Sequence, residues 1–229
     1  MTTTTIPVET SFGPFINYCY ILVDEVSREA AIIDPAWQMD KITAVLDGLR
    51  VRLRYVLITH SHLDHTNLAE RFVKRYGAQL VVSELEHQWS GYGQGYSSLL
   101  VCEGQRLVIG RNHVTCFMTP GHTPGSACYQ WGRDLFTGDT LFPDGCGICE
   151  SMEWATELFH SLRRLVTLMA DDVRILSGHS YQVANGLTFA QAKKTNIYLQ
   201  IDKVDQFCKF RMRRGQKNLF TFSSLPVTD

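Results

Sequence analysis

The sequence lacks the features that direct proteins into or across membranes. Its first residues, MTTTTIPVETSFG, contain neither the basic segment nor the apolar segment of a secretory signal peptide. No apolar run approaches the roughly 20 residues that a membrane-spanning helix needs. We therefore expect a cytoplasmic protein that has no membrane partner.

An excess of charge is also absent, because 22 Lys and Arg residues face 23 Asp and Glu residues, for a net charge of −1. Proteins that bind nucleic acid usually carry a basic face, so we expect no nucleic-acid partner. The seven cysteines do not make an even set for disulfide pairing. Without a secretory signal, this count predicts reduced thiols.

Hydrophobic periodicity predicts alternating strands and helices, without repeats or low-complexity segments. The runs INYCYILVD and EAAIID flank the polar EVSR and predict a β-hairpin. Helical spacing appears at 39–50, 66–77, 151–169, 188–201 and 204–210, and short β runs occupy the stretches between. This order predicts two mixed sheets with helices outside. We expect one domain over residues 1–229, with a short helical C-terminal extension from about residue 188.

Residue types that bind metals are concentrated directly after the apolar run RYVLITH. The stretch THSHLDHTN places His60, His62, Asp64 and His65 within six residues. A lone histidine is usually a surface residue, and we interpret the isolated histidines in that way: His87, His113 and His160. Four potential ligands after one strand are difficult to explain by chance, so this stretch predicts a metal site.

Three further side chains follow strands that end in a glycine turn, namely His122, Asp139 and His179. Because strand ends can meet at one edge, we expect these side chains to join the four above. Five imidazoles and two carboxylates exceed the three protein ligands of a single catalytic zinc, so they favour two ions. Asp139 suits the bridging position, since its carboxylate has two oxygens. The ligand types fit zinc, iron or manganese.

Four motifs in this order, THSHLDH, TPGHTPGS, FTGDTLF and SGH, resemble the metallo-β-lactamase superfamily. The resemblance implies an α/β fold, a four-layer αββα sandwich with the metal site at one edge of the two central sheets. It also implies that Asp34, in IIDPA, braces the site. The implied ligands are His60, His62 and His122 for one ion, Asp64, His65 and His179 for the other, and Asp139 between them.

Zinc β-lactamases usually have a cysteine where this chain has Asp139, which argues against lactam hydrolysis. The segment GDTLFPDGCGICE resembles the glyoxalase II branch, whose members hydrolyse thioesters. The segments GCGIC, GHSY and FRMRRGQKNLFTF resemble zinc-dependent hydrolases of trans-acyltransferase polyketide biosynthesis. The resemblance therefore implies two Zn²⁺ ions and an acyl thioester substrate, carried by an acyl carrier protein.

The implied mechanism is attack by a metal-bound hydroxide, which Asp64 orients through a hydrogen bond. No serine or cysteine nucleophile is required. The spacing of Cys146 and Cys149 allows a redox pair, but no second such pair and no βαβ context accompany it. We expect Cys146 to lie beside the metals and to shape the loop.

A basic cluster in the tail predicts an anion site for a phosphopantetheine phosphate or an acidic carrier protein, with a solvated helix face as the alternative. Its members are Lys209, Arg211, Arg213, Arg214 and Lys217, and the last four are the predicted substrate-binding residues. Two other activities remain open, hydroxyacylglutathione hydrolysis and an iron-dependent persulfide dioxygenase reaction. Phosphodiester cleavage is disfavoured by the near-neutral charge, and intact ligands disfavour a non-catalytic binding protein.

Overall fold

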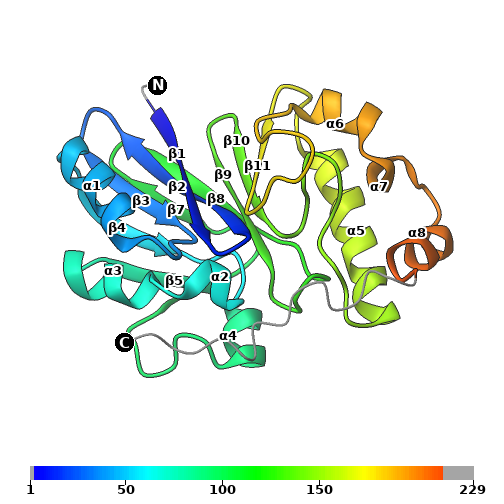
Figure 1. The fold of residues 1–229 in the computed structure, drawn as a ribbon, viewed down its shortest axis with the longest axis horizontal. Helices are drawn as coiled ribbons and strands as arrows, with labels where there is room; N and C mark the ends of the chain where they lie inside the picture. Colours follow the sequence, from blue (N-terminus) through cyan, green and yellow to red (C-terminus); the bar gives the residue numbers. More distant parts are fainter. Residues whose placement is uncertain (1–2, 214–229) are drawn as a thin grey trace.

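Two β-sheets face each other and carry helices on their outer surfaces (Figure 1). The computed structural model describes residues 3–213. The first sheet has the strand order β1-β2-β3-β4-β5-β6, and the second has the order β11-β10-β9-β8-β7. This arrangement confirms the predicted αββα sandwich.

The first sheet lies entirely within the first half of the chain. Its strands are β1 (Thr3–Phe12), β2 (Phe15–Asp24), β3 (Glu29–Ile33), β4 (Arg52–Leu57), β5 (Gln79–Ser83) and β6 (Leu99–Val101). Pairing is antiparallel from β1 to β3 and parallel from β3 to β6. Strand β1, which contains Pro7, was not predicted. A proline is tolerated there because β1 is an edge strand.

The second sheet follows in sequence. Its strands are β7 (Arg106–Ile109), β8 (Asn112–Met118), β9 (Ala127–Trp131), β10 (Asp134–Gly138) and β11 (Arg174–Ser177). Neighbours are antiparallel except for β10 and β11, which are parallel. The long helix between β10 and β11 provides the crossover that a parallel pair needs.

The helices are α1 (Met39–Leu49), α2 (Leu63–Thr66), α3 (Ala69–Tyr76), α4 (Glu84–Ser90), α5 (Met152–Leu168), α6 (Phe189–Thr195), α7 (Ile197–Gln200) and α8 (Val204–Arg211). They agree with the predicted periodicity except at α2, which precedes the helix predicted over 66–77, at α4 and at Asn196. Helix α4 was not predicted. The helix expected over 188–201 is instead interrupted at Asn196. The Asn196 side chain accepts from Tyr198 N at the start of α7 and donates to the carbonyls of Phe142 and Gly145.

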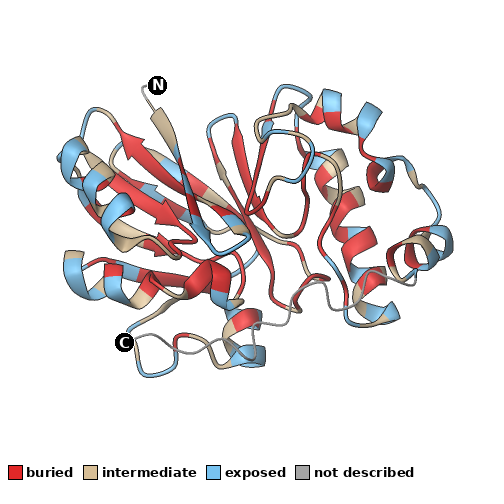
Figure 2. Ribbon diagram, viewed as in Figure 1, coloured by how far each residue is buried: buried red, intermediate tan, exposed pale blue. Residues whose placement is uncertain are grey.

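Alternation along β2 shows how the layers form. Cys19, Ile21 and Val23 pack against α1 and α3, whereas Tyr20 and Leu22 pack between the two sheets. Both faces of the strand are therefore buried, as Figure 2 shows for the central strands. A third cluster fills the space between the second sheet and α5 to α8. Every helix within residues 3–213 is too short or too polar to cross a lipid bilayer.

Candidate metal centre

The structure brings the seven predicted ligand side chains together at one edge, where the two sheets meet. His60 follows β4, while Asp64 and His65 lie on the short helix α2. His122, Asp139 and His179 come from the loops after β8, β10 and β11. Backbone hydrogen bonds join the sheets at this edge, from Ala127 N to Thr59 O and from Tyr18 N to Gly178 O, each 2.8 Å long.

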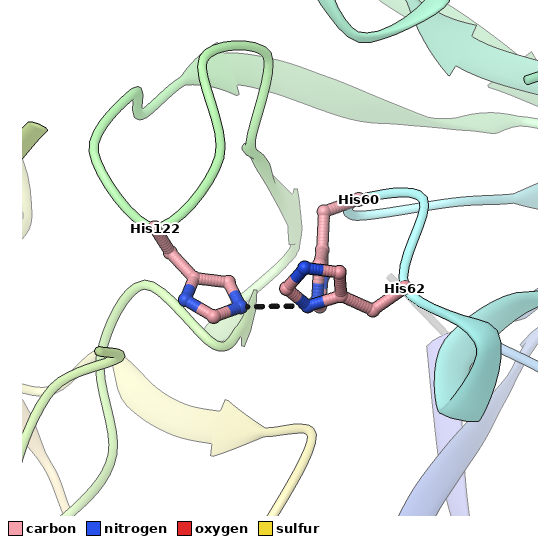
Figure 3. Close-up of side chains that lie close together, drawn as sticks. All are labelled: His60, His62 and His122. Atoms are coloured by element: carbon pink, nitrogen blue, oxygen red, sulfur yellow. Dashed lines mark hydrogen bonds between the residues drawn. The ribbon is translucent and has the colours of Figure 1, made fainter. Parts of the chain in front are cut away.

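Three histidines form the first group. His62 Nδ1 lies 3.0 Å from His60 Nε2 and 3.0 Å from His122 Nε2. Figure 3 shows His122 reaching this point from a different loop than His60 and His62. Nitrogens around a tetrahedral zinc, with Zn–N near 2.0–2.1 Å, lie roughly 3.3 Å apart. The group therefore has the size of a three-histidine metal site.

Asp64, His65 and His179 form the second group. Asp64 Oδ2 lies 3.1 Å from His179 Nε2 and 3.6 Å from His65 Nε2. The carboxylate and the two imidazoles thus face a common point.

Asp139 lies between the two groups. Its Oδ2 is 3.7 Å from His122 Nε2, in the first group. Its Oδ1 is 3.3 Å from His65 Nε2 and 3.7 Å from His179 Nε2, in the second group. Each carboxylate oxygen therefore faces a different group, which is the geometry that a bridging ligand requires.

Four of the imidazoles have a hydrogen-bond partner at Nδ1, the ring nitrogen that points away from the site, and these bonds determine which nitrogen carries the proton. His122 Nδ1 donates to Ile148 O at 2.8 Å, and His179 Nδ1 donates to Ile16 O at 2.8 Å. His65 Nδ1 donates to Asp34 Oδ2 at 2.9 Å. His60 Nδ1 lies 3.1 Å from the Thr59 hydroxyl, which itself donates to Asp34 Oδ2. Because these Nδ1 atoms carry the proton in a neutral ring, their Nε2 lone pairs point into the site.

The electrostatics favour neutral rings at His60 and His122 and ionised carboxylates at Asp64 and Asp139. Burial lowers the pKa of His122 to about 4 and holds the pKa of His60 well below its usual value. Burial opposes ionisation of Asp139, but His179 and His65 hold its pKa well below the ordinary range. Neutral imidazoles and ionised carboxylates are the forms that bind metals.

Buried polar atoms provide a test of whether these residues fit metal ions. Within residues 3–213, His65 Nε2 and Asp139 Oδ1 are buried and make no hydrogen bond of ordinary geometry. Both atoms are acceptors once His65 Nδ1 carries the ring proton, and a cation would satisfy both. The donor set of nitrogen and carboxylate oxygen suits zinc or iron. The residues therefore fit the metals that the sequence implies.

Gly178 allows the second group to pack this closely. A Cβ atom at this position would collide with the ring of His65 and with Asp139 Oδ1. Only glycine leaves room for both side chains beside the strand end.

Two further buried residues, which were not predicted, support the ligand groups. The Asn17 amide donates to Asp64 Oδ2 at 3.1 Å and to Asp64 O at 2.9 Å. Glu86 on α4 accepts hydrogen bonds from both loops that carry the first group. A polar residue within the apolar strand INYCYILVD was the available signal for Asn17. No comparable signal marked Glu86, because α4 itself was not predicted.

Two of the four predicted substrate residues, Arg211 and Arg213, lie within the described part of the chain. Arg211 is buried, and its Nη1 donates to Cys146 O at 3.1 Å and to the Tyr198 hydroxyl at 3.2 Å. Arg213 is exposed and contacts the same hydroxyl and the ring of Phe210. Arg214 and Lys217 lie outside the described residues. Cys146 is buried in the cluster between the second sheet and α5 to α8.

Comparisons with known proteins agree with this geometry. The model of the metallo-beta-lactamase superfamily matches residues 12–179. "Probable polyketide biosynthesis zinc-dependent hydrolase PksB" of Bacillus subtilis (strain 168) is 40% identical over 217 residues, which cover 94% of this chain and 96% of that protein. The hydroxyacylglutathione hydrolase of Blochmanniella pennsylvanica (strain BPEN) is 32% identical, with coverage of 74% and 64%. The structure of ETHE1 from Myxococcus xanthus superimposes with a TM-score of 0.79 at 28% identity, covering 97% and 92%.

Proposed function

Because this chain belongs to the metallo-β-lactamase superfamily, we propose that it is a zinc-dependent hydrolase that cleaves acyl thioesters. The position of Asp139 carries this proposal. One carboxylate presents an oxygen to each of two ligand groups, which supports a site for two ions. In the first group His60, His62 and His122 would hold an ion, and in the second Asp64, His65 and His179 would do so.

The chemistry divides between the ions and the protein. Zinc bound by these residues lowers the pKa of water towards ~7 and polarises the substrate carbonyl. Asp64 orients the attacking water through a hydrogen bond, and the Asn17 amide holds that carboxylate in place. Water adds to the carbonyl carbon, the C–S bond breaks, and the products are a carboxylate and a thiol. Thiolates are good leaving groups, so no protein acid is assigned.

A cysteine nucleophile is not part of this proposal. Cys146 is 4% exposed, and burial raises the pKa of its thiol to about 12. A thiol in that state forms little thiolate near neutral pH and is a poor nucleophile.

The proposed substrate is an acyl group on an acyl carrier protein of polyketide biosynthesis. The similarity to PksB over nearly the whole of both chains supports this choice, since that relative is named for polyketide biosynthesis. Exposed Arg213 supplies a cation for a phosphopantetheine phosphate or an acidic carrier surface. A second candidate is hydroxyacylglutathione hydrolysis, which the 32% identical relative favours.

A panel of thioesters separates the two substrates. Purified protein is analysed for metal and then assayed with acyl-glutathione, acyl-coenzyme A and acyl-carrier-protein thioesters. We expect two zinc ions per chain and the highest kcat/KM with the carrier-protein thioester. A preference for acyl-glutathione would favour the second candidate. One iron per chain with oxygen uptake would instead favour a persulfide dioxygenase.

Variants test the site itself. His60→Ala and Asp64→Ala should each reduce thioester hydrolysis roughly 10²–10⁴-fold. His160→Ala is the matched control, because His160 is an exposed histidine on α5. Full activity in His60→Ala and Asp64→Ala would disprove the metal mechanism.

A further inference from the structure

Glu86 is a fully buried glutamate that belongs to neither ligand group. It lies in the first turn of α4, between the two loops that carry His60, His62 and His122. Its Oε1 accepts from Ser61 N at 2.7 Å and from Ser61 Oγ at 2.6 Å. Its Oε2 accepts from Thr123 Oγ1 at 2.7 Å and from Gly125 N at 3.1 Å.

The residues that Glu86 binds are the immediate neighbours of the ligands. Ser61 separates His60 from His62, and Thr123 directly follows His122. Each oxygen of the carboxylate therefore holds one of the two loops. The distance between the loops determines how closely the three imidazole nitrogens approach one another.

The carboxylate is stabilised by donors rather than by a cation. All four partners donate, and two are backbone N–H groups that cannot rotate away. Charge-assisted hydrogen bonds are shorter and roughly twice as strong as neutral ones. A neutral amide would leave one backbone N–H, that of Ser61 or of Gly125, without its acceptor, because its NH₂ group would face that donor.

The second loop is built around this contact. A Cβ atom at Gly125 would collide with the backbone of Glu86. Ser83 accepts from Glu86 N and donates to Gly125 O at 2.5 Å. Helix α4 and the turn after His122 are therefore so close that no residue larger than glycine fits at position 125.

We propose that Glu86 is a positioning residue, which sets the separation of the two loops and so tunes metal affinity at the three-histidine group alone. This inference rests on the proposed function only through the assignment of the two ligand groups. It predicts a selective effect, because Glu86 contacts neither Asp64, His65 nor His179.

The test uses single-site proteins, which are variants that keep only one of the two ligand groups. His179→Ala should leave the three-histidine group intact, and His122→Ala should leave the second group. Glu86→Gln is introduced into each, and metal-free protein is titrated with Zn²⁺ against a chromophoric chelator. We expect affinity to fall roughly 10- to 100-fold in the His179→Ala protein and to stay unchanged in the His122→Ala protein. Glu84→Gln, the same change on the exposed face of α4, should alter neither.

Each of the following outcomes decides one part of the proposal. Equal affinity with and without Glu86→Gln in the His179→Ala protein overturns the inference, as does an equal loss in both single-site proteins.

If circular dichroism shows that Glu86→Gln does not fold, Ser61→Ala replaces it, because it removes one donor and leaves the carboxylate three partners. Unchanged zinc affinity in that variant also overturns the inference. A parent protein that binds no zinc refutes the site assignment, and one that binds zinc without thioester hydrolysis refutes only the proposed reaction.

Discussion

At the scale of single residues, Asn17 shows how one buried amide supports several groups. Its NH₂ group donates to the Asp64 carboxylate and carbonyl, while its oxygen accepts from Trp37 Nε1 at 2.7 Å. Asp64 and Trp37, the residues that form these hydrogen bonds, both lie in segments distant in sequence from Asn17. The amide orients the Asp64 carboxylate without adding charge to the site.

Substitution of Asn17 has an expected order of severity. Asn17→Ala should lower the affinity for the metal ion at the second ligand group, which contains Asp64, roughly 10- to 100-fold. The same substitution should lower the free energy of unfolding by about 1–3 kcal/mol, because the Asp64 carbonyl and the Trp37 indole lose a buried partner. Asn17→Asp should bind metal less tightly than Asn17→Ala, since it places a second carboxylate against Asp64. Zinc titration measures both variants, and wild-type affinity in Asn17→Asp would contradict this role.

Glycine at 178 gives a second prediction at this scale. Gly178→Ala should abolish binding of one metal, because the added methyl group collides with His65 and Asp139. Gly48→Ala is the control, since Gly48 lies in α1 with open space around its Cβ position. The control should stabilise the protein by about 0.4–1 kcal/mol and keep full metal content. Thermal unfolding and metal analysis test both, and full metal binding by Gly178→Ala would show that the packing argument is wrong.

The cluster of seven predicted side chains could be anticipated, because all seven are metal-binding residue types that follow the ends of strands. The roles of Asn17 and Glu86 could not be anticipated, because Asp64 lies 47 residues from Asn17, Ser61 lies 25 residues from Glu86, and no spacing links these pairs. Tertiary contact alone gives these two residues their roles.

At the scale of elements, helix α8 supports the loop that follows Asp139. Arg211 binds Cys146 O, and two residues later Ile148 O accepts from His122 Nδ1. The loop thus connects the last described helix with the three-histidine group. The sequence predicted the helical pattern of α8 correctly, but not that one of its cations would be buried.

Arg211 and Arg213 should differ when each is replaced by methionine. Arg211→Met should lower the free energy of unfolding by about 1–3 kcal/mol, because the buried Cys146 carbonyl loses a donor. Melting temperature should fall by roughly 2–4 °C for each kcal/mol. Arg213→Met should leave stability almost unchanged and raise KM for carrier-protein thioesters if it contacts the phosphate. Calorimetry and steady-state kinetics separate the effects, and an unchanged KM would remove Arg213 from the predicted anion site.

At the scale of the whole molecule, burial distributes the cysteines unequally. All seven are within the described residues and unpaired, and Cys102 alone among them is exposed. Burial raises the pKa of Cys116 and Cys146 to about 12, so neither forms much thiolate at pH 8. The odd cysteine count predicted free thiols, and the structure confirms it for residues 3–213.

Brief alkylation should therefore label a single thiol. Iodoacetamide at pH 8 should modify Cys102 in the native protein and all seven cysteines in denaturant. Mass spectrometry after digestion identifies the labelled sites, and Cys102→Ser is the control that should leave the native protein unlabelled. Rapid labelling of Cys146 would contradict its burial.

The two sheets are contiguous in sequence, residues 3–101 for the first and 106–177 for the second. A chain cut between β6 and β7 would yield one fragment with His60, His62, Asp64 and His65, and another with His122, Asp139 and His179. Neither fragment would hold a complete ligand group of the proposed site. High-affinity zinc uptake by a mixture of the two would then report their reassociation, so the metal centre could serve as a sensor for fragment complementation.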